Sequence, residues 1–432
     1  MDRLNIVYIH SHDTGRYVQP YGHAVPTPNI QRLAEQGVLF RQMFSAAPTC
    51  SASRAALLTG QWPHRCGMTG LAHRGWSLND YSHHLVRTLR GAGYRSVLCG
   101  VQHVAAQPDA IGYDERPAVD WRQAADVAGA AAGFLRAAPR EPFFLSVGFV
   151  ETHREFPRPG PAEDARFCLP PAPLPDTPRT RGDMARFKAA ARQFDDGVGA
   201  VLAAIDSSGL AGRTLVVCTT DHGIAFPGMK CTLSDHGIGV MFLLRGPGGP
   251  LAGGKVCEAM LSHVDVLPTL CELLGIAPPP WLDGVSFLPV LRGQADEARD
   301  ELFAEVTYHA AYEPMRCART RRWKYVRRFD GRSRPVLPNC DASPSKDVWL
   351  AAGWRDRPVE AEQLFDLTFD PNECRSVVAE PFAADALADM RRRLDEYMRR
   401  TADPLLAGPV PMPDGAWADD ADDLHPTNRP RS

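Results

Sequence analysis

The chain of 432 residues contains no apolar run approaching the ~20 residues that a membrane-spanning helix needs. Its first residues lack a basic segment followed by a long apolar stretch and a small-residue cleavage site, so we expect a cytoplasmic protein. Basic residues are also not in excess, because 48 Lys and Arg stand against 51 Asp and Glu, for a net charge of -3. This balance argues against nucleic acid or an anionic membrane as a partner.

The sequence also lacks the glycine-rich motifs of nucleotide-binding loops and the regularly paired cysteines of a disulfide framework. No GxGxxG follows the first expected strand and no GxxxxGK[ST] occurs, so an ordinary nucleotide-binding α/β protein has no support. The 11 cysteines are an odd number scattered without paired spacing. That pattern is typical of reduced thiols that fill a core rather than of a disulfide framework.

Strand and helix patterns alternate over the first two thirds of the chain. Apolar, β-branched runs predict buried strands at 4–10, 95–100, 142–149, 214–219 and 240–244, with another at 40–44. Amphipathic segments between them predict helices at 28–37, 53–60, 81–91, 124–138, 186–207 and 265–274. The alternation predicts an α/β fold in which helices sandwich a large, mostly parallel central sheet.

The pattern changes near residue 295. Three strand-like pieces at 301–307, 315–319 and 323–329 precede one helical segment at 383–399. We therefore expect a catalytic domain over 1–295 and a smaller C-terminal α+β domain over 296–405, with a short antiparallel sheet and one packing helix. An extended tail over 406–432 would follow, and its Pro- and Asp-rich end from 412 onward should pack poorly.

Polar residues able to bind a ligand follow several of the expected strands. They are His12 with Asp13, Asp221 with His222, His103, and His153. A single His or Asp at a strand end is more often a hydrogen-bonding or turn residue. Ligands collect beyond the carboxyl ends of parallel strands, however, so the joint pattern indicates one metal-centred site.

Cys50 lies in the segment PTCSASRAALLTG, with Ala52 two residues on and Arg54 four residues on. A buried Cys at a helix start would be the structural alternative. The segment resembles the signature of type I sulfatases of the alkaline-phosphatase-like superfamily, in which Cys-x-Pro/Ala-x-Arg is recognised by a maturation enzyme. Collinear segments such as NIVYIHSHDTGRY and TLVVCTTDHGIAFPGMK extend the resemblance from about residue 4 to 380. Within the family, FPGMK and EPMRCARTRRWKYV look most like the N-sulfoglucosamine sulfohydrolases, or sulfamidases.

The resemblance implies a nucleophile that is formylglycine, made from Cys50 by a formylglycine-generating enzyme. The hydrated aldehyde is a geminal diol, of which one hydroxyl attacks sulfur while the other later collapses to the aldehyde and expels sulfate. The N-terminus of the helix that follows Cys50 favours an anion, and Arg54 would steady the diol and the carboxylates nearby.

The resemblance also implies one divalent metal ion, held by His12, Asp13, Asp221 and His222 with the oxidised Cys50. The family usually has two consecutive Asp residues where this chain has His12 and Asp13, and often Asp-Asn where it has Asp221 and His222. Oxygen ligands suit Ca²⁺, which we expect first, whereas imidazole ligands shift the preference toward Mn²⁺ or another transition metal.

The sulfate-binding and proton-transfer residues implied by the family are His103, His153 and Lys230, beside Cys50 and Arg54. The family has a Lys two residues before the first of these histidines, where this chain has Val101. Weaker candidates for substrate contacts, each equally explained as a loop residue, are His73, Arg74, His236, His309 and Arg316.

We therefore expect hydrolysis of a sulfate ester or an N-sulfate on a small sulfated substrate, a sugar among the candidates. Hydrolysis of a phosphonate monoester or a phosphodiester at the same site is the first alternative, favoured by His222 and Val101. A non-catalytic protein that binds sulfated ligands is the second. The Pro-rich stretch 157–178 offers a surface for an oligomer contact.

Overall fold

The computed structural model describes residues 3–427. Its main sheet has seven strands in the order β4-β5-β1-β6-β7-β2-β8. The four strands β4, β5, β1 and β6 are parallel, β7 is antiparallel to both of its neighbours, and β2 and β8 are parallel. The strands span Asn5–Ser11 (β1), Val38–Phe40 (β2), Arg95–Gly100 (β4), Phe143–Gly148 (β5), Thr214–Thr220 (β6), Phe242–Arg245 (β7) and Lys255–Cys257 (β8).

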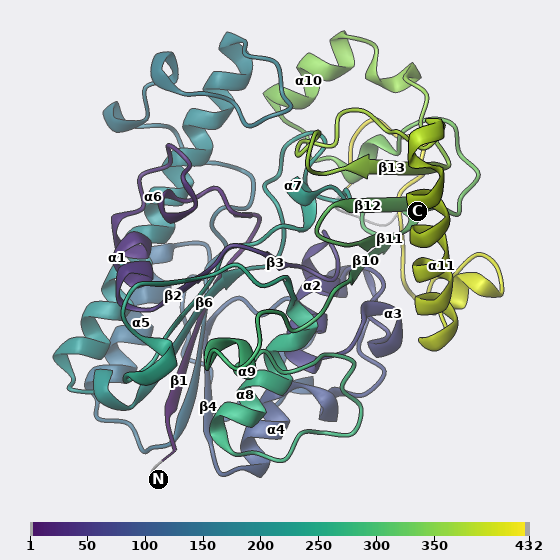
Figure 1. The fold of residues 1–432 in the computed structure, drawn as a ribbon. Helices are drawn as coiled ribbons and strands as arrows, with labels where there is room; N and C mark the ends of the chain where they lie inside the picture. The colour runs from purple at the N-terminus through teal and green to yellow at the C-terminus, as the bar shows by residue number, and fades with distance from the viewer. Residues whose placement is uncertain (1–2, 428–432) are drawn as a thin grey trace.

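Helices cover both faces of this sheet (Figure 1). On one side lie α1 (Pro28–Gln36), α5 (Ala124–Arg136) and α6 (Pro178–Ser207), and on the other lie α2 (Cys50–Thr59), α4 (Leu85–Gly91) and α8 (Val266–Leu274). Successive strand residues point to opposite faces, so neighbours on β1 enter different cores. Val7 packs in the core with α5 and α6, whereas Ile6 packs in the core with α2, α4 and α8. Burial on both faces explains the continuous apolar runs of the central strands.

The C-terminal part of the chain forms a four-stranded antiparallel sheet in the order β10-β11-β12-β13. Its strands span Leu302–Tyr308, Tyr312–Arg319, Trp323–Arg328 and Glu362–Asp366, and α11 (Ala384–Arg400) packs on it. Tyr397 of α11 stacks on Phe303 of β10 with ring centroids 4.0 Å apart, and Trp62 meets Tyr397 edge-on at 5.3 Å. The shorter elements are α3 (Pro63–Cys66), α7 (Asp235–Ile238), α9 (Leu288–Leu291), α10 (Pro344–Ala351), β3 (Met43–Phe44) and β9 (Leu261–Ser262).

The predicted architecture is confirmed: a mostly parallel sheet between helices, followed by a smaller antiparallel sheet with one packing helix. Within residues 3–427, no helix is both long and apolar enough to cross a membrane. The expectation of a poorly packed tail is wrong for its described part around 417–419. The Trp417 ring lies 3.9 Å from the Arg74 guanidinium, and the buried Asp419 carboxylate pairs with the same guanidinium at 3.2 Å.

Candidate active site

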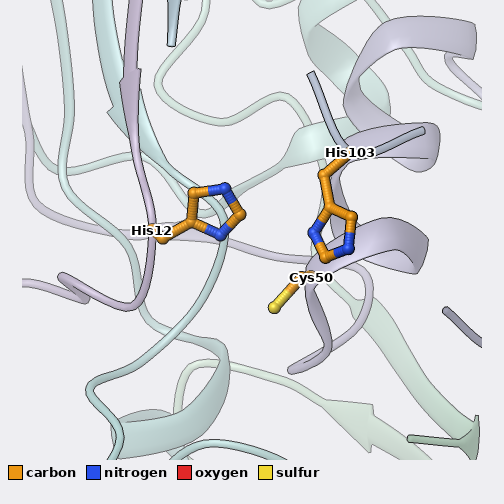
Figure 2. A group of neighbouring side chains, drawn as sticks. All are labelled: His12, Cys50 and His103. Atoms are coloured by element: carbon orange, nitrogen blue, oxygen red, sulfur yellow. The ribbon is translucent and has the colours of Figure 1, made fainter. Parts of the chain in front are cut away.

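Cys50 is the first residue of α2 and is almost fully buried beyond the carboxyl end of the main sheet. Its Sγ lies 3.2 Å from His222 Nε2 and 3.9 Å from Asp13 Oδ1. Figure 2 shows the side chains of His12 and His103 facing each other with the sulfur of Cys50 between them. Burial raises the pKa of the Cys50 thiol well above its ordinary value, so the unmodified side chain is protonated at neutral pH and is a weak nucleophile.

Two buried carboxylates meet where the parallel strands β1 and β6 end. Asp13 follows β1 and Asp221 follows β6, and the Asp13 backbone N–H donates to Asp221 Oδ1 at 2.8 Å. His222 Nδ1 donates to the Gly223 carbonyl at 2.9 Å, so Nε2 is the ring nitrogen that is free to bind a cation. That nitrogen lies 3.4 Å from Asp13 Oδ1 and faces the space between the carboxylates and Cys50.

His12 is a further candidate metal ligand beside these two carboxylates. Its ring is 3% exposed, its Nδ1 lies 3.3 Å from Asp221 Oδ2, and neither ring nitrogen forms a hydrogen bond with the described residues. Burial, reinforced by Arg54, lowers the pKa of His12 well below its usual value, so the ring is neutral. Ligand atoms of His12, Asp13, Cys50 and Asp221 all lie within 4.8 Å of one another. Two carboxylates and an imidazole without a hydrogen bond form a donor set that fits a divalent cation.

Arg54, on α2, holds the Asp221 carboxylate and the end of β1 in place through hydrogen bonds. Its Nη2 donates to Asp221 Oδ2 at 2.9 Å and to the Ser11 carbonyl at 2.6 Å. Its Nη1 donates to His10 Nδ1 at 2.6 Å, so the proton of the neutral His10 ring resides on Nε2, 3.2 Å from Ser146 Oγ. Burial opposes ionisation of Asp221, but His222 and Arg54 outweigh it and hold the pKa of this carboxyl below its ordinary value.

Lys230 brings a buried positive charge to the other side of Asp13. Its Nζ lies 2.8 Å from Asp13 Oδ2, 3.1 Å from Asp341 Oδ2 and 3.4 Å from His153 Nε2. Burial alone would lower the pKa of Lys230, but the two carboxylates outweigh it and raise the pKa well above normal, so the ammonium persists. Asp341 could not be predicted from the sequence, because it lies in a loop outside any recognisable motif.

Two backbone positions in the site are strained. Asp13 and His103 have φ values of 52° and 57°, in the left-handed region that residues with a Cβ seldom occupy. Such strain persists only where the surrounding structure fixes it, and it clusters at functional sites. His103 is further held by a contact of 2.9 Å between its Nε2 and His73 Nδ1.

A cavity of about 1040 Å³ opens in front of these histidines. Its inner end is lined by His12, His73, His103 and His153, and Val101 also lies on its wall. The side chain of His153 is 34% exposed there, and its Nδ1 contacts the Arg154 carbonyl at 2.5 Å. Because a carbonyl only accepts, His153 Nε2 carries the lone pair, directed to Lys230.

Three weaker candidates lie elsewhere than expected. Arg316 is fully buried and pairs with Asp403 at 2.6 Å, so it braces the C-terminal sheet, and it does not line the cavity. Arg74 is 4% exposed, pairs with Asp419 and does not line the cavity either. His236 contacts the Tyr17 hydroxyl at 3.1 Å and Asn372 at 3.0 Å, and it does not line the cavity.

His309 remains beside the site. It is 7% exposed, and burial is the main cause that lowers its pKa well below the ordinary value. The charge of Lys230 adds to this shift, and the charge of Asp341 opposes it. His309 is therefore neutral and lies near the Asp341 carboxylate.

The comparisons agree with this architecture. The sulfatase family model matches residues 4–276. The chain is 28% identical to N-sulphoglucosamine sulphohydrolase of Homo sapiens over 442 aligned positions, covering 89% of this chain and 88% of the relative. A structure from Bacteroides thetaiotaomicron, assigned as a sulfatase, superposes with a TM-score of 0.72 at 22% identity, over 99% of this chain and 97% of the other. Phosphonate monoester hydrolase of Agrobacterium radiobacter superposes with a TM-score of 0.69 at 20% identity, over 94% and 97%.

The sheet order, the helices on both faces and the site beyond the strand ends define an α/β sandwich fold, which the chain shares with these solved structures. The chain belongs to the sulfatase family, since the family model covers more than half of it. The family predicted from the segment around Cys50 is thereby confirmed, and the curated relatives found include sulfuric ester hydrolases.

Proposed function

We propose that this protein hydrolyses a sulfate ester or an N-sulfate on a sugar, with formylglycine made from Cys50 as nucleophile and one divalent cation beside it. The observation that carries the proposal is the position of Cys50 at the start of the buried helix α2, facing two carboxylates and two imidazoles. The human relative named N-sulphoglucosamine sulphohydrolase supports a sulfated sugar as the substrate.

Asp13, Asp221, His222 and His12 are the residues that would hold the cation. When bound, a divalent cation supplies the positive charge that makes a neighbouring hydroxyl more acidic and offsets charge on a sulfuryl group. We propose that the site accepts Ca²⁺ and that His12 and His222 shift its preference toward a transition metal such as Mn²⁺. Arg54 fixes Asp221 in position for this role.

The remaining roles are sulfate binding, which needs positive charge, and proton transfer, which an imidazole can perform. Lys230, buried and charged, is placed to neutralise sulfate oxygens next to Cys50. His153 is accessible from the cavity and its Nε2 lone pair faces the Lys230 ammonium at 3.4 Å, so it is placed to accept a proton there and to deliver it to the leaving oxygen or nitrogen. His103, held by His73, faces His12 across the same space.

The test is to co-express the chain with a formylglycine-generating enzyme, map the peptide that contains Cys50 by mass spectrometry, and assay p-nitrophenyl sulfate and glucosamine N-sulfate. We expect an aldehyde or its hydrate at position 50 and turnover that Cys50→Ala abolishes. Aldehyde present without turnover of either substrate would contradict the proposed reaction. Unmodified Cys50 with tight binding of a sulfated ligand would favour the non-catalytic alternative.

Hydrolysis of a phosphonate monoester or a phosphodiester is a second candidate. Two departures from the family pattern favour it: His222 where Asn is common, and Val101 where the family has Lys. Comparison of kcat/KM for p-nitrophenyl sulfate, p-nitrophenyl phenylphosphonate and bis-p-nitrophenyl phosphate separates the two. A large advantage of either phosphorus substrate would overturn the sulfatase assignment.

A further inference from the structure

The cavity reaches far beyond the histidines that face Cys50. Its walls come from the loops after β4 and β5 and from the segment that leads into α5. Its volume of about 1040 Å³ slightly exceeds the roughly 300–1000 Å³ typical of small-ligand sites. A single sulfated sugar ring at the inner end would leave the outer part unfilled.

The outer part is lined by Trp121 and Arg122, directly before α5. Trp121 is 44% exposed, although large aromatic side chains are usually well buried. The guanidinium carbon of Arg122 lies 4.8 Å from the centroid of the Trp121 ring. The cavity therefore carries an aromatic face with a cation beside it.

Arg122 differs from the other arginines of the cavity wall. Arg154 donates hydrogen bonds from Nη1 and Nη2 to the buried Asp183 carboxylate, each at 2.8 Å, and Arg116 forms an ion pair with Asp109. Among the described residues, no carboxylate pairs with the Arg122 guanidinium. Glu155 is the one carboxylate among the described residues that line the cavity, so the outer wall favours a negatively charged group.

We propose that this outer cavity binds the sugar next to the sulfated one, and that this second sugar carries an anionic group, either a carboxylate or a second sulfate. The C–H face of the pyranose ring packs on Trp121, and the anionic group pairs with Arg122. The proposal rests on the proposed function, because it places the reacting sulfate at Cys50. Val101 contributes no charge to the cavity wall, whereas Arg122 does.

The experiment measures binding calorimetrically with the metal-loaded Cys50→Ala variant, which cannot turn over. The probes are glucosamine N-sulfate and three disaccharides in which it is linked to glucuronate, to 6-O-sulfated glucose or to glucose. We expect one or both anionic disaccharides to bind about tenfold more tightly than the neutral one, as for one charge-assisted pair. The comparison of the two anionic probes identifies carboxylate or sulfate as the preferred group.

Two further variants test the residues. Arg122→Gln should bring the ratio of anionic to neutral affinity close to one, and Trp121→Ala should weaken all three disaccharides relative to the monosaccharide. Arg166→Gln, an 80% exposed arginine outside the cavity, is the matched control and should change neither ratio. Equal affinity for all three disaccharides, or failure of every disaccharide to bind, overturns the proposal.

Failure of the proposed function and failure of the outer subsite give different results. Wild-type protein that hydrolyses p-nitrophenyl sulfate but shows no discrimination among the disaccharides retains the reaction and loses the outer subsite. Protein that discriminates through Arg122 but hydrolyses no sulfated substrate retains the subsite and loses the reaction.

Discussion

The ammonium of Lys230 lies 3.1 Å from the carboxylate of Asp341, which comes from the loop before α10. The same ammonium contacts Asp13 at 2.8 Å, so one cation is shared between a carboxylate of the proposed metal set and a carboxylate of the C-terminal part. The charge of this buried lysine is therefore already largely balanced by the protein itself.

Removing the charge of Asp341 should free Lys230 for the substrate. We expect Asp341→Asn to lower KM for p-nitrophenyl sulfate and to strengthen inhibition by inorganic sulfate by up to about tenfold, or ~1.4 kcal/mol. Asp347→Asn, on the exposed side of α10 and paired with Arg179, is the control and should leave both constants unchanged. A higher KM in Asp341→Asn would show instead that Asp341 positions Lys230.

Arg54 stabilises the fold through the buried Asp221 carboxylate. In metal-free protein, Arg54→Met leaves that carboxylate without its guanidinium and should lower the free energy of unfolding by about 3–5 kcal/mol. Urea unfolding measures the loss, which a saturating divalent cation should reduce. Arg166→Met removes a solvent-exposed pair and should leave the free energy of unfolding nearly unchanged. Equal losses in the two variants would exclude the buried pair as a major contribution.

His12 should determine the metal preference. Thermal unfolding with graded Ca²⁺ and Mn²⁺, together with elemental analysis, gives the ratio of the two affinities. Replacing the imidazole by a third carboxylate in His12→Asp should shift this ratio toward Ca²⁺ by about tenfold or more, because hard oxygen ligands suit that ion. An unchanged ratio would place His12 outside the coordination shell.

Glu373 should make stability depend on pH. Burial, with a contribution from Asp235, raises the pKa of Glu373 from 4.5 to about 7, although Lys324 opposes the shift. Between these two values the unfolded chain releases the proton while the folded protein keeps it. The free energy of unfolding therefore falls as pH rises through this window, with a slope of up to about 1.4 kcal/mol per pH unit.

The check is a series of urea unfolding curves from pH 4.5 to 7.5. Glu373→Gln should flatten the decline, and Glu380→Gln, at a nearby surface pair, should not. A decline that survives in Glu373→Gln would assign the pH dependence to other groups.

Much of the main sheet could be predicted from the sequence. The strand predicted at 95–100 is β4 as observed, and the helix predicted at 124–138 is α5 within two residues. These elements are long, periodic and buried, so local pattern and final environment agree. The reversed direction of β7 could not be predicted, because an apolar run carries no information on the direction of its neighbours. The elements α10 and β13 were not predicted, since both are short and carry little periodicity of their own.

Part of the site, too, could be predicted from the sequence, and part could not. The sequence by itself determined the family and the residues that follow the parallel strands, because strands of one direction bring Asp13 and Asp221 to a single edge of the sheet. It could not determine which charged side chains become buried partners. Only the tertiary structure assigned Arg316 and Arg74 to internal ion pairs, brought Asp341 to Lys230 and placed Trp121 and Arg122 on the cavity wall. These contacts join segments far apart in the chain, and no local periodicity encodes them.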